Sequence, residues 1–245
     1  MQLDFTIPEM DLILYARKKT KKQGPLHFMV IYPHPDDETM MSGGTIAKYA
    51  LHPDVRWSVV ALTPGEHGDE LFKGMPPKKL AKIRKVELHR ACEILGVSQL
   101  IFAPFEDGTL KKRVADLTKF ISRLYKDEKP DLVITFEKGG IYGHPDHVTA
   151  SMVIKKLQKK YTKIPVLYGT LPEKILSRLH LPTHMADDPD SLLHSIPYMC
   201  VSFWGLGWKK YMAALCHRSQ NLNDHGRSPL WLMAIFHPIE YYSSE

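Results

Sequence analysis

The chain has 245 residues, 44% of them hydrophobic and 24% charged, so it can bury one substantial core, and we expect a single domain over 1–245. Its three cysteines show neither a CxxC spacing nor an even number, which argues against a disulfide framework or a thiolate metal site and favours a reducing, cytoplasmic setting. No apolar run reaches the ~18–20 residues that cross a bilayer, so no membrane span is expected.

The first part of the chain, residues 1–25, is expected to be an N-terminal extension. Its sequence predicts a short amphipathic helix that packs on the domain. The formal net charge is +6, and part of this excess lies in "RKKTKKQG" at 17–24. We interpret that run as a solvated connector and expect no nucleic-acid partner.

From residue 26 onward, apolar β-rich runs alternate with segments of helical period. This alternation is typical of βαβ units and a parallel sheet. The expected strands are 26–32, 56–62, 99–103, 131–136 and 165–169, and the expected helices are 43–51, 78–95, 114–126 and one that begins near His144. The order predicts an α/β fold: a Rossmann-like, doubly wound, mostly parallel sheet in a three-layer sandwich.

The tail, residues 170–245, has a weaker pattern. It opens with a loop-rich stretch, after which "YMCVSF" predicts a late strand and "WKKYMAALCHRSQ" a helix. We expect this tail to cap the sheet or to form a wall of the functional site.

A cluster of acids follows the first strand, in "VIYPHPDDETMMSGG". Ligands bind at the carboxyl ends of the strands in open α/β sheets, so "HPDDE" lies at the expected edge. His34 and Asp37 are three residues apart, so their side chains can converge, and Asp36 can face a slightly different point. The alternative is a plain helix entry with Asp36 or Asp37 as N-cap.

A second cluster, "GGIYGHPDHVTAS", follows the apolar strand "DLVITF" and should reach the same edge. Here His144 and His147 are three residues apart in a first helical turn. On its own, the segment could equally be a helix start that Asp146 stabilises.

Together the two clusters can supply His34, Asp37 and one of the later histidines to a divalent ion. Two histidines and one carboxylate with open positions suit catalytic Zn²⁺, and the same set suits Fe²⁺. A bound metal lowers the pKa of its water to about 7. Asp36 could then accept the water's proton, and a histidine that is not a ligand could donate one. The residues thus predict metal-assisted hydrolysis.

The motifs "PHPDDE" and "GHPDH" resemble those of the PIG-L/LmbE family of zinc-dependent N-acetylglucosaminyl deacetylases, which have a Rossmann-like fold. The resemblance covers roughly residues 27–157 and continues more weakly in "HRSQ" at 217–220, where the role of His217 stays open. With Pro33 before the first histidine, the motif looks most similar to deacetylases of bacillithiol biosynthesis.

The resemblance implies a role for each matching residue. It implies metal ligation by His34, Asp37 and His147. It implies that Asp36 is the general base, that His144 stabilises or protonates the tetrahedral intermediate and that Tyr142 polarises the acyl carbonyl. Arg84 and Asp107 are implied as sugar-holding residues, against the alternatives of a surface helix charge paired with Glu87 or Glu93 and of a turn-forming aspartate.

The function implied is a zinc-dependent N-deacetylase that acts on a linear amide C–N bond. Its metal-activated water would remove the N-acetyl group from a small-molecule N-acetylglucosamine conjugate. The alternatives are a deacetylase of another N-acyl amino sugar, such as an oligosaccharide or antibiotic precursor, and a non-catalytic Rossmann-like module that binds a sugar or nucleotide. The phosphate fingerprint GxGxxG is absent after the first strand, which disfavours a nucleotide site. A homo-oligomer stays open.

Overall fold

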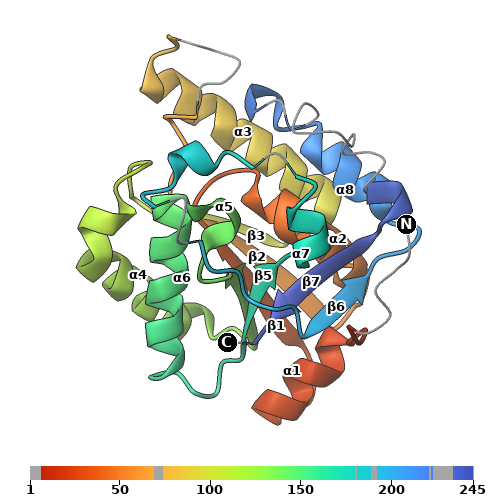
Figure 1. The fold of residues 1–245 in the computed structure, drawn as a ribbon. Coiled ribbons are helices and arrows are strands. Elements are labelled where there is room, and N and C mark those ends of the chain that lie inside the picture. Colours follow the sequence, from red (N-terminus) through yellow and green to blue (C-terminus); the bar gives the residue numbers. More distant parts are fainter. Residues whose placement is uncertain are drawn as a thin grey trace.

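The structure is a computed structural model that describes residues 7–68, 74–179, 181–188, 192–220, 222 and 234–244. Its centre is a seven-stranded sheet in the order β3-β2-β1-β4-β5-β7-β6 (Figure 1). The strands are β1 (Leu26–Tyr32), β2 (Val55–Ala61), β3 (Gln99–Phe102), β4 (Leu132–Phe136), β5 (Val166–Thr170), β6 (Met199–Ser202) and β7 (Ile239–Ser243). β1 to β5 are parallel to one another, and β7 lies antiparallel between β5 and β6.

Helices cover both faces of this sheet, which gives the expected three-layer α/β sandwich. The helices are α1 (Leu12–Thr20), α2 (Asp37–Tyr49), α3 (Pro77–Leu95), α4 (Val114–Glu128), α5 (Gly140–Gly143), α6 (Pro145–Gln158), α7 (Glu173–Leu176) and α8 (Gly207–Ala214), with 3₁₀ turns η1 (Leu110–Arg113), η2 (Thr183–Met185) and η4 (Arg218–Gln220). No helix in the described ranges is long and apolar enough to cross a membrane.

The side chains of β1 divide the core in two because successive residues of a strand point to opposite faces. Phe28 and Val30 pack with α1, α2, α3 and α8 on one face. Met29 and Ile31 pack with α4 and α6 on the other. Every residue of β1 is buried, as expected of a central parallel strand with helices on both sides.

All five strands predicted in 26–169 occur within one residue of their expected bounds. The late strand and the N-terminal helix are confirmed as β6 and α1, whereas β7 was not predicted. The helix expected at 43–51 begins six residues earlier, at Asp37, since two acids favour a first helical turn. Position 44 of this helix requires glycine, because an added Cβ would come within 2.3 Å of the Phe203 ring.

A buried ion pair attaches β7 and α8 to α2. Glu240 on β7 accepts from Lys210 Nζ at 2.6 Å and from the backbone N–H groups of Gly44 at 2.9 Å and Thr45 at 2.7 Å. Lys210 also donates to the Met40 carbonyl at 2.7 Å. The pair therefore joins the tail to the helix that starts at the first acidic cluster.

We expect Glu240→Gln to lower the free energy of unfolding by about 3 kcal/mol, because it leaves the Lys210 charge buried without a counterion. Chemical denaturation monitored by circular dichroism measures this. The matched surface variant Glu93→Gln should change stability by less than about 0.5 kcal/mol, since Glu93 is exposed. Equal effects of the two variants would contradict the structural role of the buried pair.

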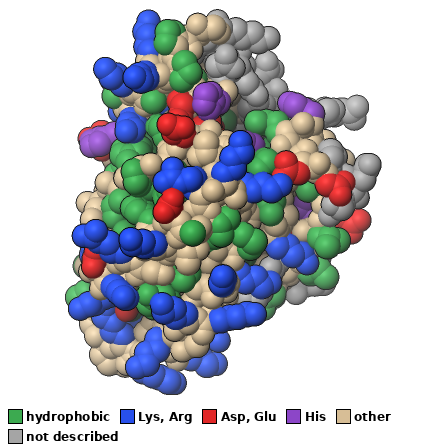
Figure 2. Space-filling model, turned by 90° about the vertical axis from the view of Figure 1, so that its left-hand side faces the viewer, with side chains coloured by type: hydrophobic (Ala, Val, Ile, Leu, Met, Phe, Trp, Pro, Cys, Tyr) green, Lys and Arg blue, Asp and Glu red, His purple; other side chains and the backbone are tan. Residues whose placement is uncertain are grey.

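Basic side chains gather over the α4–α6 side of the molecule, the face that Figure 2 presents. Many of these lysines and arginines are exposed. Arg113 at the end of η1 and Arg123 on α4 pair with the α4 acids Asp116 and Asp127. The positive excess is thus spread over a solvated face as well as in the run at 17–24.

Candidate active site

A pocket of about 670 Å³ lies at the carboxyl ends of the parallel strands. His34 follows β1 and His144 follows β4, and these two strands are hydrogen-bonded neighbours. The neighbouring parallel strands bring the two predicted clusters to one edge. Both histidines line the pocket together with Asp36 and Asp37.

The first loop holds its acids in separate directions. The Asp37 carboxylate turns back and accepts from the His34 backbone N–H at 2.9 Å. Asp36 adopts φ 109°, an uncommon conformation for a residue with a side chain. Asp36 occupies the N-cap position of α2, as the helix-entry alternative supposed, but its side chain caps no helix N–H and is therefore free for another role.

The second loop presents His147 through a glycine turn. Gly140 has φ +59°, and a Cβ there would lie 2.5 Å from the His147 Cβ. This close approach lets His147 Nδ1 donate to the Gly140 carbonyl at 3.1 Å. The next residue, Ile141, has φ 68°, a strained value for a β-branched residue, and Glu137 Oε1 accepts from its N–H at 3.0 Å.

Three donor atoms then converge. His34 Nδ1 lies 3.1 Å from His147 Nε2, and the Asp37 carboxylate lies 3.6 Å from the first nitrogen and 3.5 Å from the second. Ligand atoms about 2.0–2.2 Å from a tetrahedral ion stand ~3.3 Å apart, so the three groups fit a divalent cation. The bond from His147 Nδ1 to a carbonyl leaves its Nε2 lone pair free to ligate.

Protonation suits ligation at two of the three groups. Burial alone would lower the pKa of His34, but Asp107, Asp146 and Asp37 outweigh it and raise that pKa well above its usual value, so a metal would have to displace a proton there. Burial lowers the pKa of His147 to about 4, so its ring is neutral near pH 7. Burial by itself would raise the pKa of Asp37, but His147 and His34 outweigh it and hold that pKa below its usual value. A neutral imidazole and an ionised carboxylate are the states in which these groups bind metals.

His34 also faces a second carboxylate group with its other nitrogen. Its Nε2 lies 2.9 Å from Asp107 Oδ1 and 3.5 Å from Asp146 Oδ2, although the angle to Asp107 is not that of a hydrogen bond. A carboxylate behind a ligating histidine fixes its orientation. Two wider sets could also hold a cation, with ligand atoms within 4.8 Å of one another: His34 with His144 and His147, and His34 with Asp107 and Asp146.

Asp36 lies beside this group and faces Arg84, whose Nη2 is 3.4 Å from its Oδ2. Burial is the largest influence on Asp36 and raises its pKa to about 7, while Arg84 acts in the opposite direction. Near neutral pH, Asp36 can therefore both accept and release a proton. That balance is what a general base requires.

Arg84 is not the surface helix charge of the alternative interpretation. It is 3% exposed, and its guanidinium donates to the carbonyls of Gly65 and Pro35, both at 2.6 Å. It thus connects the loop after β2 to the first acidic loop and fixes the position of Asp36. Asp107 lies in a turn, as that alternative supposed, and also accepts from the His67 N–H at 3.1 Å.

His144 and Tyr142 point toward the same donor group. His144 Nδ1 accepts from the Asp146 N–H at 3.2 Å, so neutral His144 carries its proton on Nε2. Burial, chiefly, lowers the pKa of His144 and raises that of Tyr142 well above its usual value. Both side chains therefore offer a neutral N–H or O–H donor near pH 7, and the Tyr142 hydroxyl lies 3.5 Å from His147 Nε2.

Several contacts that support the site could not be predicted from the sequence. His217 of "HRSQ" lies 3.1 Å from Glu38 Oε1, and Glu87 on α3 accepts from the Ser219 N–H at 2.9 Å and hydroxyl at 2.6 Å. The tail thus contacts the first acidic cluster through His217 and packs on α3 through Ser219. His217 therefore reaches Glu38 of that cluster and does not only pack within the tail. The one signal was that "HRSQ" joins a histidine to three further polar residues on a predicted helix.

Asp146 is a further residue whose role the sequence did not reveal. Its carboxylate accepts from the N–H groups of Gly108 at 2.8 Å and Leu110 at 3.0 Å, so it anchors the loop that carries Asp107. It is fully buried, and it serves that loop in addition to its place in the first turn of α6.

Comparisons with known proteins identify the sequence family of this chain and proteins of similar fold. Residues 29–157 match the sequence profile of the PIG-L family, described as GlcNAc-PI de-N-acetylase. A probable N-acetyl-alpha-D-glucosaminyl L-malate deacetylase 2 of Bacillus anthracis is 37% identical over 126 residues, 49% of this chain and 54% of the relative. A 1D-myo-inositol 2-acetamido-2-deoxy-alpha-D-glucopyranoside deacetylase of Actinosynnema mirum is 31% identical over 177 residues, 61% of each chain.

Among solved structures, the N,N'-diacetylchitobiose deacetylase of Pyrococcus horikoshii superposes with a TM-score of 0.59 at 23% identity. The superposition covers 87% of this chain and 77% of that protein. Similarity at this level of identity is a similarity of fold. The chain spans about half the length of the first curated relatives that it matches.

Proposed function

The chain belongs to the PIG-L family, and from that premise we propose that it is a metal-dependent hydrolase that removes the N-acetyl group from an N-acetylglucosamine conjugate. The observation that carries the proposal is the convergence of His34 Nδ1, His147 Nε2 and the Asp37 carboxylate, with Asp36 left free beside them. The curated relatives named above act on malate and inositol conjugates of this sugar, which supports the same substrate class here.

In this proposal, His34, Asp37 and His147 hold the ion, and Zn²⁺ and Fe²⁺ both suit their donor set. The ion supplies Lewis-acid activation of the acetyl carbonyl and of a water. Asp107 and Asp146 sit behind His34 and keep its ring in the ligating orientation.

Asp36 accepts the proton that the attacking water loses as the new C–O bond forms. Arg84 fixes the carboxylate in place and stabilises its ionised form. When the C–N bond breaks, the same proton can pass from Asp36 to the departing nitrogen, so that the products are acetate and a free amine. The raised pKa of Asp36 suits both transfers.

His144 and Tyr142 stabilise the developing oxyanion. His144 keeps its Nε2 proton because Nδ1 is occupied by the Asp146 N–H. Removing one preorganised donor of this kind costs about 10²–10³ in kcat in other hydrolases. In this proposal Asp107 and Arg84, which line the polar side of the pocket, keep the sugar-side role that the resemblance implies, although both also hold the site itself.

A panel of N-acetylglucosamine conjugates tests the proposal. Malate, inositol, phosphate and oligosaccharide conjugates are incubated with zinc-loaded protein, and free amine and acetate are both quantified. We expect equimolar amine and acetate from at least one conjugate, and loss of both after chelation that zinc restores. Release of neither product, with zinc demonstrably bound, would rule out the proposed reaction for this class.

A further inference from the structure

The pocket has a polar half and an apolar half, and we infer that the apolar half is a subsite for an alkyl chain carried by the amino-sugar substrate. This inference rests on the proposed function, because the sugar must lie with its amide at His34 and Asp36. It goes further in naming what is attached to the sugar.

Strand order separates the two halves. β2 and β3 lie on one side of the central β1–β4 pair, and β5, β7 and β6 lie on the other. The loops after β2 and β3 contribute His67 and Asp107 to the pocket. The segments on the opposite side contribute the apolar side chains Leu171, Ile175, Leu179, Leu181, Phe203 and Ile239.

The available volume exceeds what an N-acetyl sugar needs. A pocket of about 670 Å³ lies in the range that buries most of a drug-sized ligand. A sugar held with its amide between the clusters after β1 and β4 would leave the apolar half filled with water. Apolar surface of this kind gains free energy when an alkyl group displaces that water.

Charge disfavours an anionic group as the occupant of this half. Among the described residues that line the pocket, Arg84 and Lys210 are the only lysine or arginine. Arg84 already donates to two carbonyls and faces Asp36, and Lys210 is paired with Glu240. A carboxylate or phosphate would therefore meet no lysine or arginine that lacks a carboxylate partner among them, and the other basic side chains on that side are the imidazoles of His184 and His237. An uncharged alkyl chain needs no counterion.

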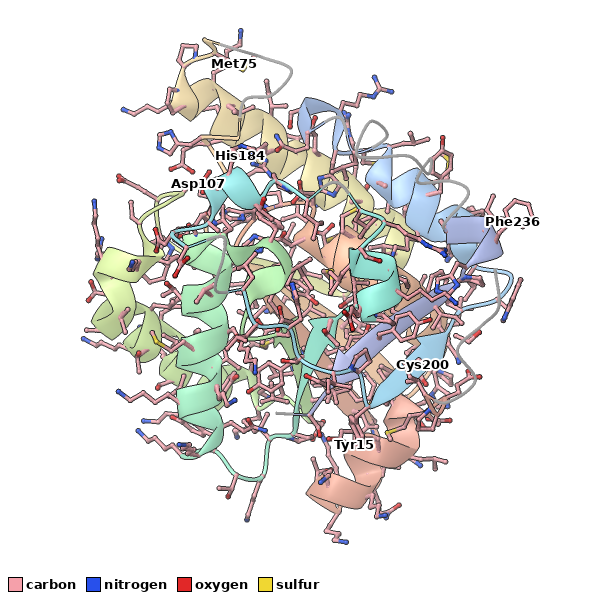
Figure 3. All side chains as sticks on the ribbon, viewed as in Figure 1. Tyr15, Met75, Asp107, His184, Cys200 and Phe236 are labelled. Carbon is pink, nitrogen blue, oxygen red and sulfur yellow. The ribbon has the colours of Figure 1, made fainter. Side chains whose placement is uncertain are left out.

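The apolar surface continues from the pocket to the outside. Phe203 lines the pocket and its neighbour Trp204 is 64% exposed, while Ala234 lines the pocket and Phe236 is 65% exposed. The two segments touch, since a Cβ on Gly207 would lie 2.0 Å from the Ala234 carbonyl oxygen. Figure 3 shows Phe236 at the right-hand edge of the molecule, with Asp107 on the opposite side of the view. A chain longer than the pocket thus meets apolar surface at its exit.

The chain could be attached as the aglycone or as the N-acyl group, and two substrate series distinguish these. One series is the methyl, butyl and octyl glycosides of N-acetylglucosamine, and the other is glucosamine with N-acetyl, N-butanoyl and N-octanoyl groups, all below micelle-forming concentration. We expect kcat/KM to rise by about fourfold per buried methylene in one series. Flat or falling values in both series, or faster turnover of a malate or phosphate conjugate than of every alkyl substrate, would overturn the inference.

Binding measured by calorimetry on metal-free protein separates this inference from the proposed function. Octyl glycoside is expected to bind at least about tenfold more tightly than methyl glycoside. If no substrate is hydrolysed but this preference persists, the proposed function fails and the subsite stands. If the conjugates are hydrolysed without any chain-length preference in turnover or binding, the subsite fails and the function stands.

Variants of the pocket wall test where the alkyl chain of the substrate binds. Ile175→Glu places a charge in the apolar half and is expected to lower the octyl-to-methyl affinity ratio by at least about tenfold. Ser177→Glu introduces the same charge two residues away at an exposed position that does not line the pocket, and it should leave the ratio unchanged. If Ile175→Glu is poorly folded by circular dichroism, Leu181→Asn tests the same wall. An unchanged ratio in a folded wall variant would contradict the assignment.

Discussion

Replacing Asp36 by asparagine is expected to lower kcat for amide hydrolysis by about 10²–10⁴-fold while the metal content stays the same. Asp36 lies beside the three converging donors but is not one of them, and its carboxylate faces Arg84 instead. Asparagine keeps the size of the side chain and tolerates the positive φ of this position better than alanine does. The loss therefore reports the missing proton acceptor.

The pH dependence gives a second readout for the same variant. Asp36 must be ionised to accept a proton, so activity falls as the pH drops through the pKa of this group. Burial raises that pKa to about 7, and a bound cation would lower it from there, so the acid limb of kcat/KM should lie at or below about pH 7. The limb should disappear in Asp36→Asn.

The control is Glu106→Gln, an exposed acid one residue before Asp107 that should retain activity within about twofold. Full activity of Asp36→Asn, or an unchanged acid limb in the variant, would show that another group accepts the proton.

Replacing His147 by glutamine is expected to abolish stable metal binding. Loss of a residue that hydrogen-bonds to a metal ligand lowers the affinity for the metal by about 10–100-fold, and loss of the ligand itself should lower it further. The side chain is fully buried and stacks on Phe136 with ring centroids 4.1 Å apart, so circular dichroism must first show that the variant is folded. Metal content after dialysis, measured by mass spectrometry, gives the result.

His144→Gln is the matched comparison because this histidine also lies within reach of an ion. If Asp37 is the third ligand, His144→Gln keeps the metal and loses turnover. If the wider set of His34, His144 and His147 binds instead, both variants lose the metal and Asp37→Asn keeps it. Retention of metal by His147→Gln would contradict both sets.

The sequence was most informative where the chain obeys local rules. Buried parallel strands are short apolar runs, and the strand that precedes each cluster places its polar residues at the carboxyl edge. For this reason the strands at 26–32 and 131–136, and the meeting of His34 with His144 and His147, could be predicted without a structure. β7 was not predicted. It follows an irregular tail, and its sequence does not indicate which strands it pairs with.

Long-range contacts explain the remaining differences. Whether Arg84 is exposed depends on the loops at Pro35 and Gly65, which lie far from it in sequence. Likewise, Glu38 and His217 are 179 residues apart, so only the fold brings the two together. Such charges are placed by tertiary structure, and periodicity within one helix does not reveal them.

The two-sided pocket depends on the same tail. Its segments after β5 and β6 supply the apolar wall, while the buried pair of Lys210 and Glu240 holds α8 and β7 against α2. The sequence predicted that this tail would cap the sheet or form a wall of the site. It did not predict that the wall would be apolar, which the structure reveals.

The most direct test of the account is a crystal structure of zinc-loaded protein with anomalous scattering collected at the zinc edge. We expect one ion with His34 Nδ1, His147 Nε2 and an Asp37 carboxylate oxygen at about 2.0–2.2 Å, and Asp36 outside bonding distance. An ion held by Asp107 and Asp146 instead, or side chains of the three residues that point apart around no ion, would contradict it.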